Sequence, residues 1–361
     1  KLRESMIGRI KSPSLLKKYF NNNGTNALIY WFHSSSLGEF YQVKTIIEGL
    51  KEGQDDIKCI VSFSSPSGFR HATSDAMDLK FYIPFDFPWT IVGVLNAVGP
   101  KKILFASYDL WPNLVWIAKA KGIHMNIFSV RIMGNSLKTR RPFKNVFQAV
   151  YSSLSSIYTI SEKDMKGICN VLGDNQGPSL RVMGNPRYDL VMRDSIKFRE
   201  QDGEDIQDRE LRIIIGSAHK EEEHYLIPAM VHLMNTNPDL KVLYALHEPS
   251  ESAINDIKKR FYDNGCVGTV FRKKTELALP SDRLVILGVV GVLSKLYWQC
   301  KIAYVGGGHS TGVHNVMEPA VARLPVLFGP RYHNSHEAEE LVAHDGGFCV
   351  HDKDEILSIT K

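Results

Sequence analysis

The chain has 361 residues, of which 43% are hydrophobic and 23% are charged, and this composition excludes the disordered and fibrous classes of protein. The formal net charge of +5 is too small to indicate a nucleic-acid partner, although an anionic partner is expected. The five cysteines are scattered and include no C-x-x-C pair, so neither a disulfide framework nor a zinc site is predicted, and a reducing compartment is expected.

The first twenty residues, KLRESMIGRIKSPSLLKKYF, carry six Lys or Arg side chains against one Glu. Leu2, Met6 and Ile10 are spaced to share one helical face until Pro13 interrupts the helix. Such a basic amphipathic segment predicts contact with an anionic membrane surface, and the alternative is a charged helix packed on its own domain. No run approaches the roughly 18 apolar residues of a membrane span. The start at Lys1, without a methionine, predicts a fragment of a longer protein.

Short apolar runs then alternate with helical patterns, which predicts parallel sheets with helices on both faces. We expect strands at 27–33, 57–63, 81–84, 102–106, 125–130, 156–160 and 180–183. The charged stretch at 191–210 predicts a linker or a surface helix. Further strands are expected at 211–216, 241–246, 268–271, 284–287, 301–305 and 325–328. The predicted fold class is therefore α/β, with Rossmann-like doubly wound domains at 1–190 and 211–361 that face an interdomain cleft.

The first predicted strand runs into three serines and an acidic residue, in 28-LIYWFHSSSLGEF-40. Ser36 and Glu39 have the S-x-x-E spacing of a capping box, which gives Glu39 a purely structural role. Ligands of open α/β sheets bind beyond the carboxyl ends of the strands, so the other interpretation is that Glu39 takes a proton from an acceptor hydroxyl. Gly38 would then leave space for the substrate.

A glycine-rich stretch, 303-AYVGGGHSTGVHNVMEPAVARLPVLFG-329, follows a late strand. Gly306 to Gly308 permit a sharp turn and a close approach to a ligand, and a helical pattern resumes at Val313. A helix start there predicts an anion site, and the alternative is a tight turn without a ligand. The glycines match neither the dinucleotide nor the P-loop pattern, which argues against dehydrogenases and P-loop proteins.

Five segments carry a resemblance to a known family: WFHSSSLGEF, SYDLWPNL, VMGNPRYD, GSAHKEEE and YVGGGHSTGVHNVMEPAVARLPVLFGP. In this order they resemble the transferases of Kdo (3-deoxy-D-manno-octulosonic acid) in lipopolysaccharide synthesis, in a Bacteroidetes-like variant. The resemblance implies a GT-B glycosyltransferase with inverting chemistry, CMP-Kdo as donor, a lipid A precursor as acceptor, and neither cofactor nor metal. It also implies an N-terminal anchor before Lys1 and a location at the cytoplasmic face of the bacterial inner membrane.

The same resemblance implies roles for particular residues. Glu39 matches the catalytic base of the family. Asp109 stands where the family usually has Glu, and Arg187 stands where many members have Lys. Both of these positions are expected to stabilise the transition state. Glu318 is expected at the ribose hydroxyls of the donor, in a domain that binds CMP-Kdo. The full donor set is Ser217, His219, Leu246, His247, Gly291, Gly307, Gly308, His314, Asn315, Val316, Met317 and Glu318. The acceptor set is Ser35, Ser36, Gly38, Arg140 and Arg141, on the N-terminal domain.

Two segments depart from the family pattern. Residues 245–250 lack the arginine that would hold the donor phosphate, and residues 288–293 lack the usual acid, so that only backbone contacts are expected there. The basic cluster around Arg140 and Arg141 is either a contact for acceptor phosphates or a solvated loop. Two alternative functions therefore stay open, namely another GT-B enzyme that uses a UDP-sugar, as a transferase or an epimerase, and a catalytically silent nucleotide-binding scaffold.

Overall fold

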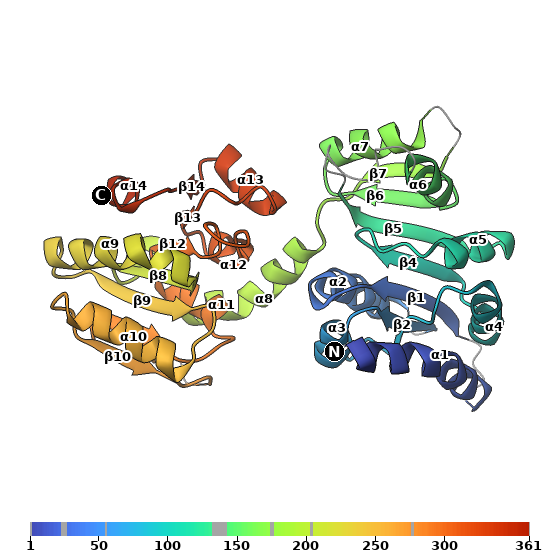
Figure 1. Ribbon diagram of the computed structural model, residues 1–361, viewed down its shortest axis with the longest axis horizontal. Coiled ribbons are helices and arrows are strands. Elements are labelled where there is room, and N and C mark those ends of the chain that lie inside the picture. The colour runs from blue at the N-terminus through green and yellow to red at the C-terminus, as the bar shows by residue number, and fades with distance from the viewer. Residues whose placement is uncertain are drawn as a thin grey trace. The chain divides into compact units, whose positions relative to one another are not determined.

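The computed structural model describes residues 2–22, 27–54, 56–131, 143–173, 177–202, 205–275 and 278–360. The chain divides into two compact units, Lys1–Leu190 and Val191–Lys361, which are called unit 1 and unit 2 below (Figure 1). Each unit contains one seven-stranded sheet in which the neighbouring strands run parallel. The expectation of an α/β fold with two Rossmann-like, parallel-sheet domains is confirmed.

In unit 1 the strands are ordered β3-β2-β1-β4-β5-β6-β7. Alternate residues of β1 face opposite sides: Trp31 packs into one core cluster and Phe32 into the other, so helices cover both faces of the sheet. The strands are β1 (Leu28–Ser34), β2 (Ile57–Phe63), β3 (Leu79–Tyr82), β4 (Lys102–Ala106), β5 (His124–Val130), β6 (Ser156–Thr159) and β7 (Ser179–Val182). The helices are α1 (Leu2–Asn22), α2 (Leu37–Gly53), α3 (Pro66–His71), α4 (Pro88–Val98), α5 (Pro112–Ala120), α6 (Phe143–Tyr151) and α7 (Glu162–Leu172). Helix α8 (Arg187–Asp202) begins in unit 1 and continues into unit 2.

In unit 2 the strand order is β10-β11-β9-β8-β12-β13-β14, and Ile213 and Ile214 of β8 again face opposite core clusters. The strands are β8 (Arg212–Ala218), β9 (Lys241–Leu246), β10 (Gly268–Phe271), β11 (Leu284–Leu287), β12 (Ile302–Val305), β13 (Val326–Phe328) and β14 (Gly347–Cys349). The α-helices are α9 (Glu223–Thr236), α10 (Glu251–Tyr262), α11 (Leu293–Leu296), α12 (Met317–Val321), α13 (His336–Ala343) and α14 (Lys353–Ile359). Short 3₁₀ turns are η2 (Ile206–Asp208), η3 (Lys220–Glu222) and η4 (Tyr297–Gln299).

Both sheets contain a point at which the chain reverses its direction of winding. In unit 1, β1 lies between β2 and β4, and in unit 2, β8 lies between β9 and β12. Loops that leave the carboxyl ends of such strands diverge to opposite faces and open a crevice, where ligands of this fold class bind. Residues for binding and catalysis are therefore expected in the loops that follow β1 and β4 in unit 1, and in those that follow β8, β9 and β12 in unit 2.

Three local predictions are wrong. Helix α1 continues through Pro13, although proline has no backbone N–H to donate. The helix is held at this point by side-chain hydrogen bonds. The Ser12 hydroxyl contacts the carbonyls of Gly8 and Tyr82, and Arg9 donates to the Ile83 carbonyl. Strand β14 was not predicted, since it has only three residues and begins at the second of two consecutive glycines. The helix expected from Val313 begins at Met317 and spans five residues. Within the described ranges, no helix is both long enough and apolar enough to cross a bilayer.

Candidate functional site

The turn between β1 and α2 holds Glu39 by hydrogen bonds that differ from the predicted capping box. Ser36 caps the helix, and its hydroxyl accepts from the Glu39 backbone N–H at 3.4 Å. The Glu39 carboxylate does not return to Ser36. Its Oε2 accepts instead from two donors of Ser35, the backbone N–H at 2.5 Å and the hydroxyl at 2.6 Å. The predicted box is therefore wrong by one residue, and a Cβ on Gly38 would meet only the Ser36 hydroxyl, at 3.9 Å.

Glu39 is a buried carboxyl group, with 7% of its surface exposed. Burial raises its pKa above the ordinary value, and the nearby charge of Asp109 acts in the same direction. The two hydrogen bonds from Ser35 and the charge of His33 oppose this rise without cancelling it. A carboxylate with a raised pKa holds a proton more readily, which is the property that a general base requires near neutral pH.

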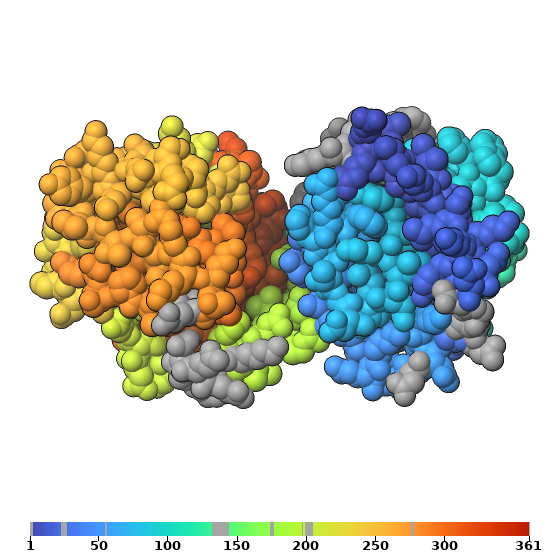
Figure 2. Space-filling model, turned by 90° about the horizontal axis from the view of Figure 1, so that it is seen from below, coloured from blue at the N-terminus to red at the C-terminus, as the bar shows by residue number. Residues whose placement is uncertain are grey.

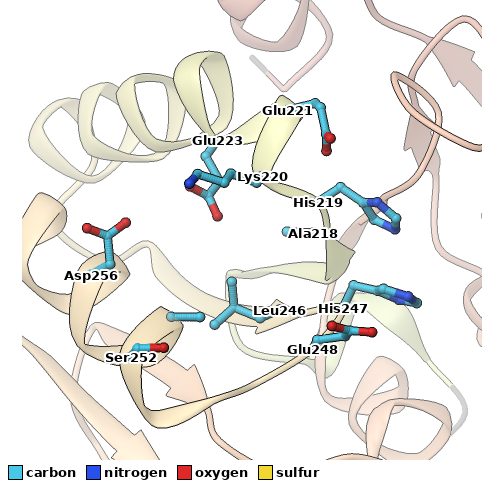
Figure 3. A pocket seen from close by; sticks show the side chains of 11 residues that line it. Ala218, His219, Lys220, Glu221, Glu223, Leu246, His247, Glu248, Ser252 and Asp256 are labelled. Atoms are coloured by element: carbon cyan, nitrogen blue, oxygen red, sulfur yellow. The ribbon is translucent and has the colours of Figure 1, made fainter.

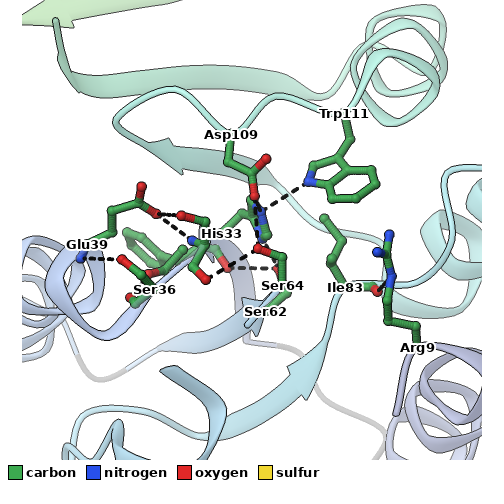
Figure 4. A network of polar contacts seen from close by, with 12 residues as sticks. Arg9, His33, Ser36, Glu39, Ser62, Ser64, Ile83, Asp109 and Trp111 are labelled. Atoms are coloured by element: carbon green, nitrogen blue, oxygen red, sulfur yellow. Dashed lines mark hydrogen bonds and ion pairs between the residues drawn. The ribbon is translucent and has the colours of Figure 1, made fainter. Parts of the chain in front are cut away.

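Asp109 follows β4, the neighbour of β1, and lies in a network of polar contacts (Figure 4). His33 Nε2 lies 2.9 Å from Asp109 Oδ2, and the Ser64 hydroxyl donates to the same oxygen at 3.0 Å. His33 is fully buried and its Nδ1 lies 2.9 Å from the Ser62 hydroxyl. The indole N–H of Trp111 also points to His33 Nε2, at 3.2 Å.

The environment of Asp109 acts on its pKa in the direction opposite to that of Glu39. Burial raises the pKa of Asp109, but the hydrogen bond and charge of His33, with further donors at Ser64 and Trp111, bring the net pKa below the ordinary value. Two carboxyl groups at neighbouring strand ends are thus shifted apart, one toward proton uptake and the other toward permanent charge. Such a pair is suited to separate roles as base and electrostatic stabiliser.

The cation beside Asp109 is Arg9, which the sequence did not indicate as a site residue. Its guanidinium lies 4.5 Å from the ring centre of Phe85 and 4.4 Å from that of Trp111, and its Nε donates to Ile83 at 3.1 Å. Burial lowers the pKa of Arg9, and the charge of Asp109 opposes that change. Sequence analysis interpreted the basic residues of the first twenty positions as a membrane contact, so it did not predict that Arg9 lies near Asp109.

Arg187 starts α8 in a turn that rests on α2. Its backbone N–H donates to Asn185 at 3.1 Å, and Thr45 of α2 donates to the Pro186 carbonyl at 3.1 Å. The turn that carries Arg187 therefore contacts the helix that carries Glu39, two turns further along. Of the predicted acceptor residues, Arg140 and Arg141 lie outside the described residues.

In unit 2 the run Gly306–Gly308 packs against the unit's own backbone. A Cβ at Gly306 would lie 2.1 Å from the Ser217 carbonyl oxygen, one at Gly307 would lie 2.4 Å from the Gly312 oxygen, and one at Gly308 would lie 2.5 Å from the Gly329 nitrogen. Gly307 also has a φ of +93°. The glycines are therefore required by close backbone contacts within the unit, whatever they contribute to a ligand.

Glu222 ties the loop after β8 to this glycine turn. Its fully buried carboxylate accepts from the backbone N–H groups of His219, Gly307 and His309 at 3.1 to 3.3 Å, and from the Tyr304 hydroxyl at 3.2 Å. Four donors stabilise the charge of a carboxylate that has no contact with bulk water. Sequence analysis gave Glu222 no role of its own, because its burial and its contacts with the glycine turn follow only from the fold.

Three histidines meet where β9, β8 and β12 end. His219 Nε2 lies 2.6 Å from His314 Nε2, and the ring centre of His247 lies 4.5 Å from each of the other two. Burial lowers the pKa of His314 to about 4, and the charges of His247 and His219 add to this. The cluster borders a pocket of about 490 Å³ that is also lined by Leu246 (Figure 3). Its acidic lining residues are Glu221, Glu223, Glu248 and Asp256.

The remaining predicted donor residues lie in the same unit. Ser217 and Gly291 adopt positive φ angles of 55° and 85°, the first being a strained conformation for a residue with a side chain. The Asn315 side chain accepts from the Met317 N–H at 3.1 Å, at the start of α12. Val316 and Met317 are buried. Glu318 lies in the first turn of α12. Burial raises the pKa of Tyr297, and the charge of Glu318 adds to this rise.

The chain is similar to proteins of known class. The family described as 3-Deoxy-D-manno-octulosonic-acid transferase (kdotransferase) matches residues 8–190. A 3-deoxy-D-manno-octulosonic acid transferase of Aquifex aeolicus is 24% identical over 95% of this chain and 89% of its own length. That of Haemophilus influenzae is 25% identical over 85% and 72%. The structure of a UDP-GlcNAc 2-epimerase from Neisseria meningitidis, bound to UDP-GlcNAc, covers 92% of this chain and 90% of its own, with 15% identity and a TM-score of 0.61, a likeness of fold alone.

Proposed function

The chain belongs to the 3-deoxy-D-manno-octulosonic-acid transferase family, and we propose that it moves Kdo from CMP-Kdo to a lipid A precursor, with inversion at the anomeric carbon. Membership of the family makes the protein a Kdo-transferring glycosyltransferase. The donor, the acceptor and the place of action, at the cytoplasmic face of a bacterial inner membrane, are parts of the proposal. The observation that carries it is the pair of carboxyl groups, Glu39 and Asp109, whose pKa values are shifted in opposite directions at one sheet edge.

The proposed reaction needs a base and a stabilising charge. The Glu39 carboxylate takes the proton of an acceptor hydroxyl, the hydroxyl oxygen forms a bond to the anomeric carbon of Kdo, and the bond from that carbon to the phosphate oxygen breaks, so that CMP leaves with the electron pair. Asp109 keeps its charge and stabilises the positive charge that develops on the sugar. Arg187 and Arg9 are the cations proposed to balance the anionic donor.

The donor is proposed to bind unit 2. Ser217, His219, Gly291 and the segment from Gly307 to Glu318 provide backbone N–H groups, imidazoles and one carboxylate there. The arginine that the family pattern places in the segment 245–250 is missing, so imidazole and backbone groups would carry recognition of the phosphate. We propose that this recognition and the transfer need neither a metal nor a cofactor.

The acceptor is a lipid, and unit 1 has a surface suited to a membrane. Helix α1 packs on α4, and Met6, Ile7 and Ile10 of α1 and Trp89 of α4 are exposed. Figure 2 shows residues of the dark blue N-terminal helix on the surface of unit 1. The same helix exposes lysines at 11, 17 and 18. Exposed apolar side chains beside lysines favour binding at the interface of an anionic bilayer.

The test is an assay of CMP release with purified protein, CMP-Kdo and a tetraacylated lipid A precursor, in the presence of EDTA. We expect release that depends on the acceptor and a product whose mass has increased by Kdo. Absence of acceptor-dependent release would reject the proposal, and activity that appears only without EDTA would reject metal independence. The product mass also gives the number of Kdo units added.

Nucleotide specificity is tested separately, since the structural neighbour that binds UDP-GlcNAc shares only the fold. We expect CMP to raise the melting temperature of the protein more than UDP or GDP does at equal concentration. A larger rise with UDP would favour the alternative of a UDP-sugar enzyme.

A further inference from the structure

The three histidines His219, His247 and His314 form a cluster of nitrogen ligands. One ring nitrogen of each lies within 4.8 Å of the others. A tetrahedral zinc site with Zn–N bonds of about 2.0–2.1 Å keeps its nitrogens roughly 3.4 Å apart, so small rotations of the side chains would bring these three into position. Figure 3 shows the His219 and His247 rings directed to the same side of the pocket.

The backbones that carry the three imidazoles are fixed on their neighbours. The His247 N–H donates to the Ala218 carbonyl, next to His219, and the His314 N–H donates to the Gly306 carbonyl, both at 3.0 Å. The His219 N–H donates to the buried Glu222 carboxylate at 3.1 Å. The ligands are thus held in place by the fold, which reduces the loss of entropy on binding.

The hydrogen bonds of the His219 ring make its inner nitrogen, Nε2, an acceptor that faces His314 Nε2 at 2.6 Å. The Ser310 hydroxyl donates to the Gly307 carbonyl at 3.3 Å, so its oxygen accepts from Nδ1 of His219 at 2.9 Å. This places the His219 proton on Nδ1 and leaves Nε2 unprotonated. A histidine whose outer nitrogen donates to a fixed oxygen is the arrangement typical of metal-ligating imidazoles.

From this geometry we infer that His219, His247 and His314 bind a borderline divalent cation such as Zn²⁺, and that the bound cation competes with the donor. Three imidazoles favour Zn²⁺, Co²⁺, Ni²⁺ and Cu²⁺ over Mg²⁺ and Ca²⁺. The competition rests on the proposed function, because the same histidines belong to the proposed donor site. The cation is therefore an inhibitor and is not required for transfer.

Binding is tested on untagged full-length protein without any donor, after removal of metals by dialysis against a chelator. Titration with Co²⁺ is expected to give one equivalent bound, with the absorption of a four-coordinate nitrogen site and no sulfur charge-transfer band, and Zn²⁺ is expected to displace it. His247→Ala and His219→Ala should each weaken Co²⁺ binding by at least about tenfold. His247 is exposed, so its variant should fold, and His232→Ala, at an exposed position on α9, is the matched control.

Absence of stoichiometric Co²⁺ binding, equal binding by the His247→Ala variant, or a thiolate band would each overturn the inference. Competition is tested by the rise in melting temperature that CMP causes, which should fall when Zn²⁺ is present and recover with EDTA. An unchanged CMP effect in the presence of bound Zn²⁺ would overturn the competition. Co²⁺ binding does not depend on any nucleotide, so a failure of the proposed function would leave that result intact.

Discussion

At the scale of single residues, Glu39 and Asp109 are similar carboxyl groups whose surroundings shift their pKa values in opposite directions, which suits them to different roles. Both are carboxylates at the ends of adjacent strands, and burial raises the pKa of each. The outcome differs because His33 is a hydrogen-bond partner of Asp109, whereas the Glu39 carboxylate accepts from the neutral donors of Ser35. The assignment of the base therefore depends on a buried histidine that sequence analysis did not mention.

We predict that Glu39→Gln lowers the rate of Kdo transfer by about 10²–10⁴-fold, the range of a general base. The amide cannot take the proton of the acceptor, while the donor, which is proposed to bind unit 2, should be unaffected. Turnover is measured as CMP release, and donor binding by the CMP-induced rise in melting temperature. A variant that keeps its turnover would show that another group acts as the base.

The pH dependence of the same group gives a second prediction. Glu39 acts when ionised, so turnover is lost as the pH falls through its pKa, and because that pKa is raised, the acid limb should lie above 4.5. Ser35→Ala removes a hydrogen bond that lowers the pKa, so the limb should move to higher pH. Profiles of kcat/KM against pH measure both effects, with Ser14→Ala, on the exposed side of α1, as the control. A shift to lower pH in Ser35→Ala would contradict the assignment.

At the scale of elements, Glu222 joins the start of η3 to the turn after β12. Glu222→Gln exchanges a charged acceptor of four hydrogen bonds for an amide with one acceptor oxygen, and we predict a loss of about 1–3 kcal/mol in the free energy of unfolding. Denaturant unfolding of the full chain measures it. The neighbouring Glu221→Gln is the matched control, because Glu221 is exposed and should change stability little. Equal losses in the two variants would show that the buried bonds contribute nothing specific.

The elements also show what could be predicted from sequence. Strands such as β2, β4 and β9 were predicted at their observed bounds, since each is an apolar run buried on both faces. The late start of α12 was missed because it depends on a local side-chain hydrogen bond between Asn315 and the Met317 N–H. The continuation of α1 through Pro13 was missed because it depends on a hydrogen bond from Ser12 to Tyr82, far away in the sequence. The roles of Arg9 and His33 were missed for the same reason, as they follow from contacts over more than seventy positions in the sequence. Motif similarity indicated Glu39 but not its partner at Ser35.

At the scale of the whole molecule, the chain combines two sheets of the same type with different chemistry at their strand ends. Unit 1 presents carboxyl groups and unit 2 presents imidazoles and glycine turns, which matches a reaction that needs a base on one substrate and an anion site for the other. The exposed apolar side chains of α1 and α4 belong to unit 1, which supports the proposal that the unit that binds the lipid acceptor also contacts the membrane.

This division predicts that the protein binds anionic vesicles through unit 1. Ile10 and Trp89 are 63% and 73% exposed, and insertion of either side chain into the interface should contribute about 1.5–3 kcal/mol. Ile10→Asp and Trp89→Asp should therefore each lower partitioning onto vesicles of phosphatidylglycerol by about tenfold or more, as measured by co-sedimentation. Val267→Asp changes an equally exposed apolar residue of unit 2, at 72%, and should have little effect. Similar losses in all three variants would mean that the surface of unit 1 has no special part in membrane contact.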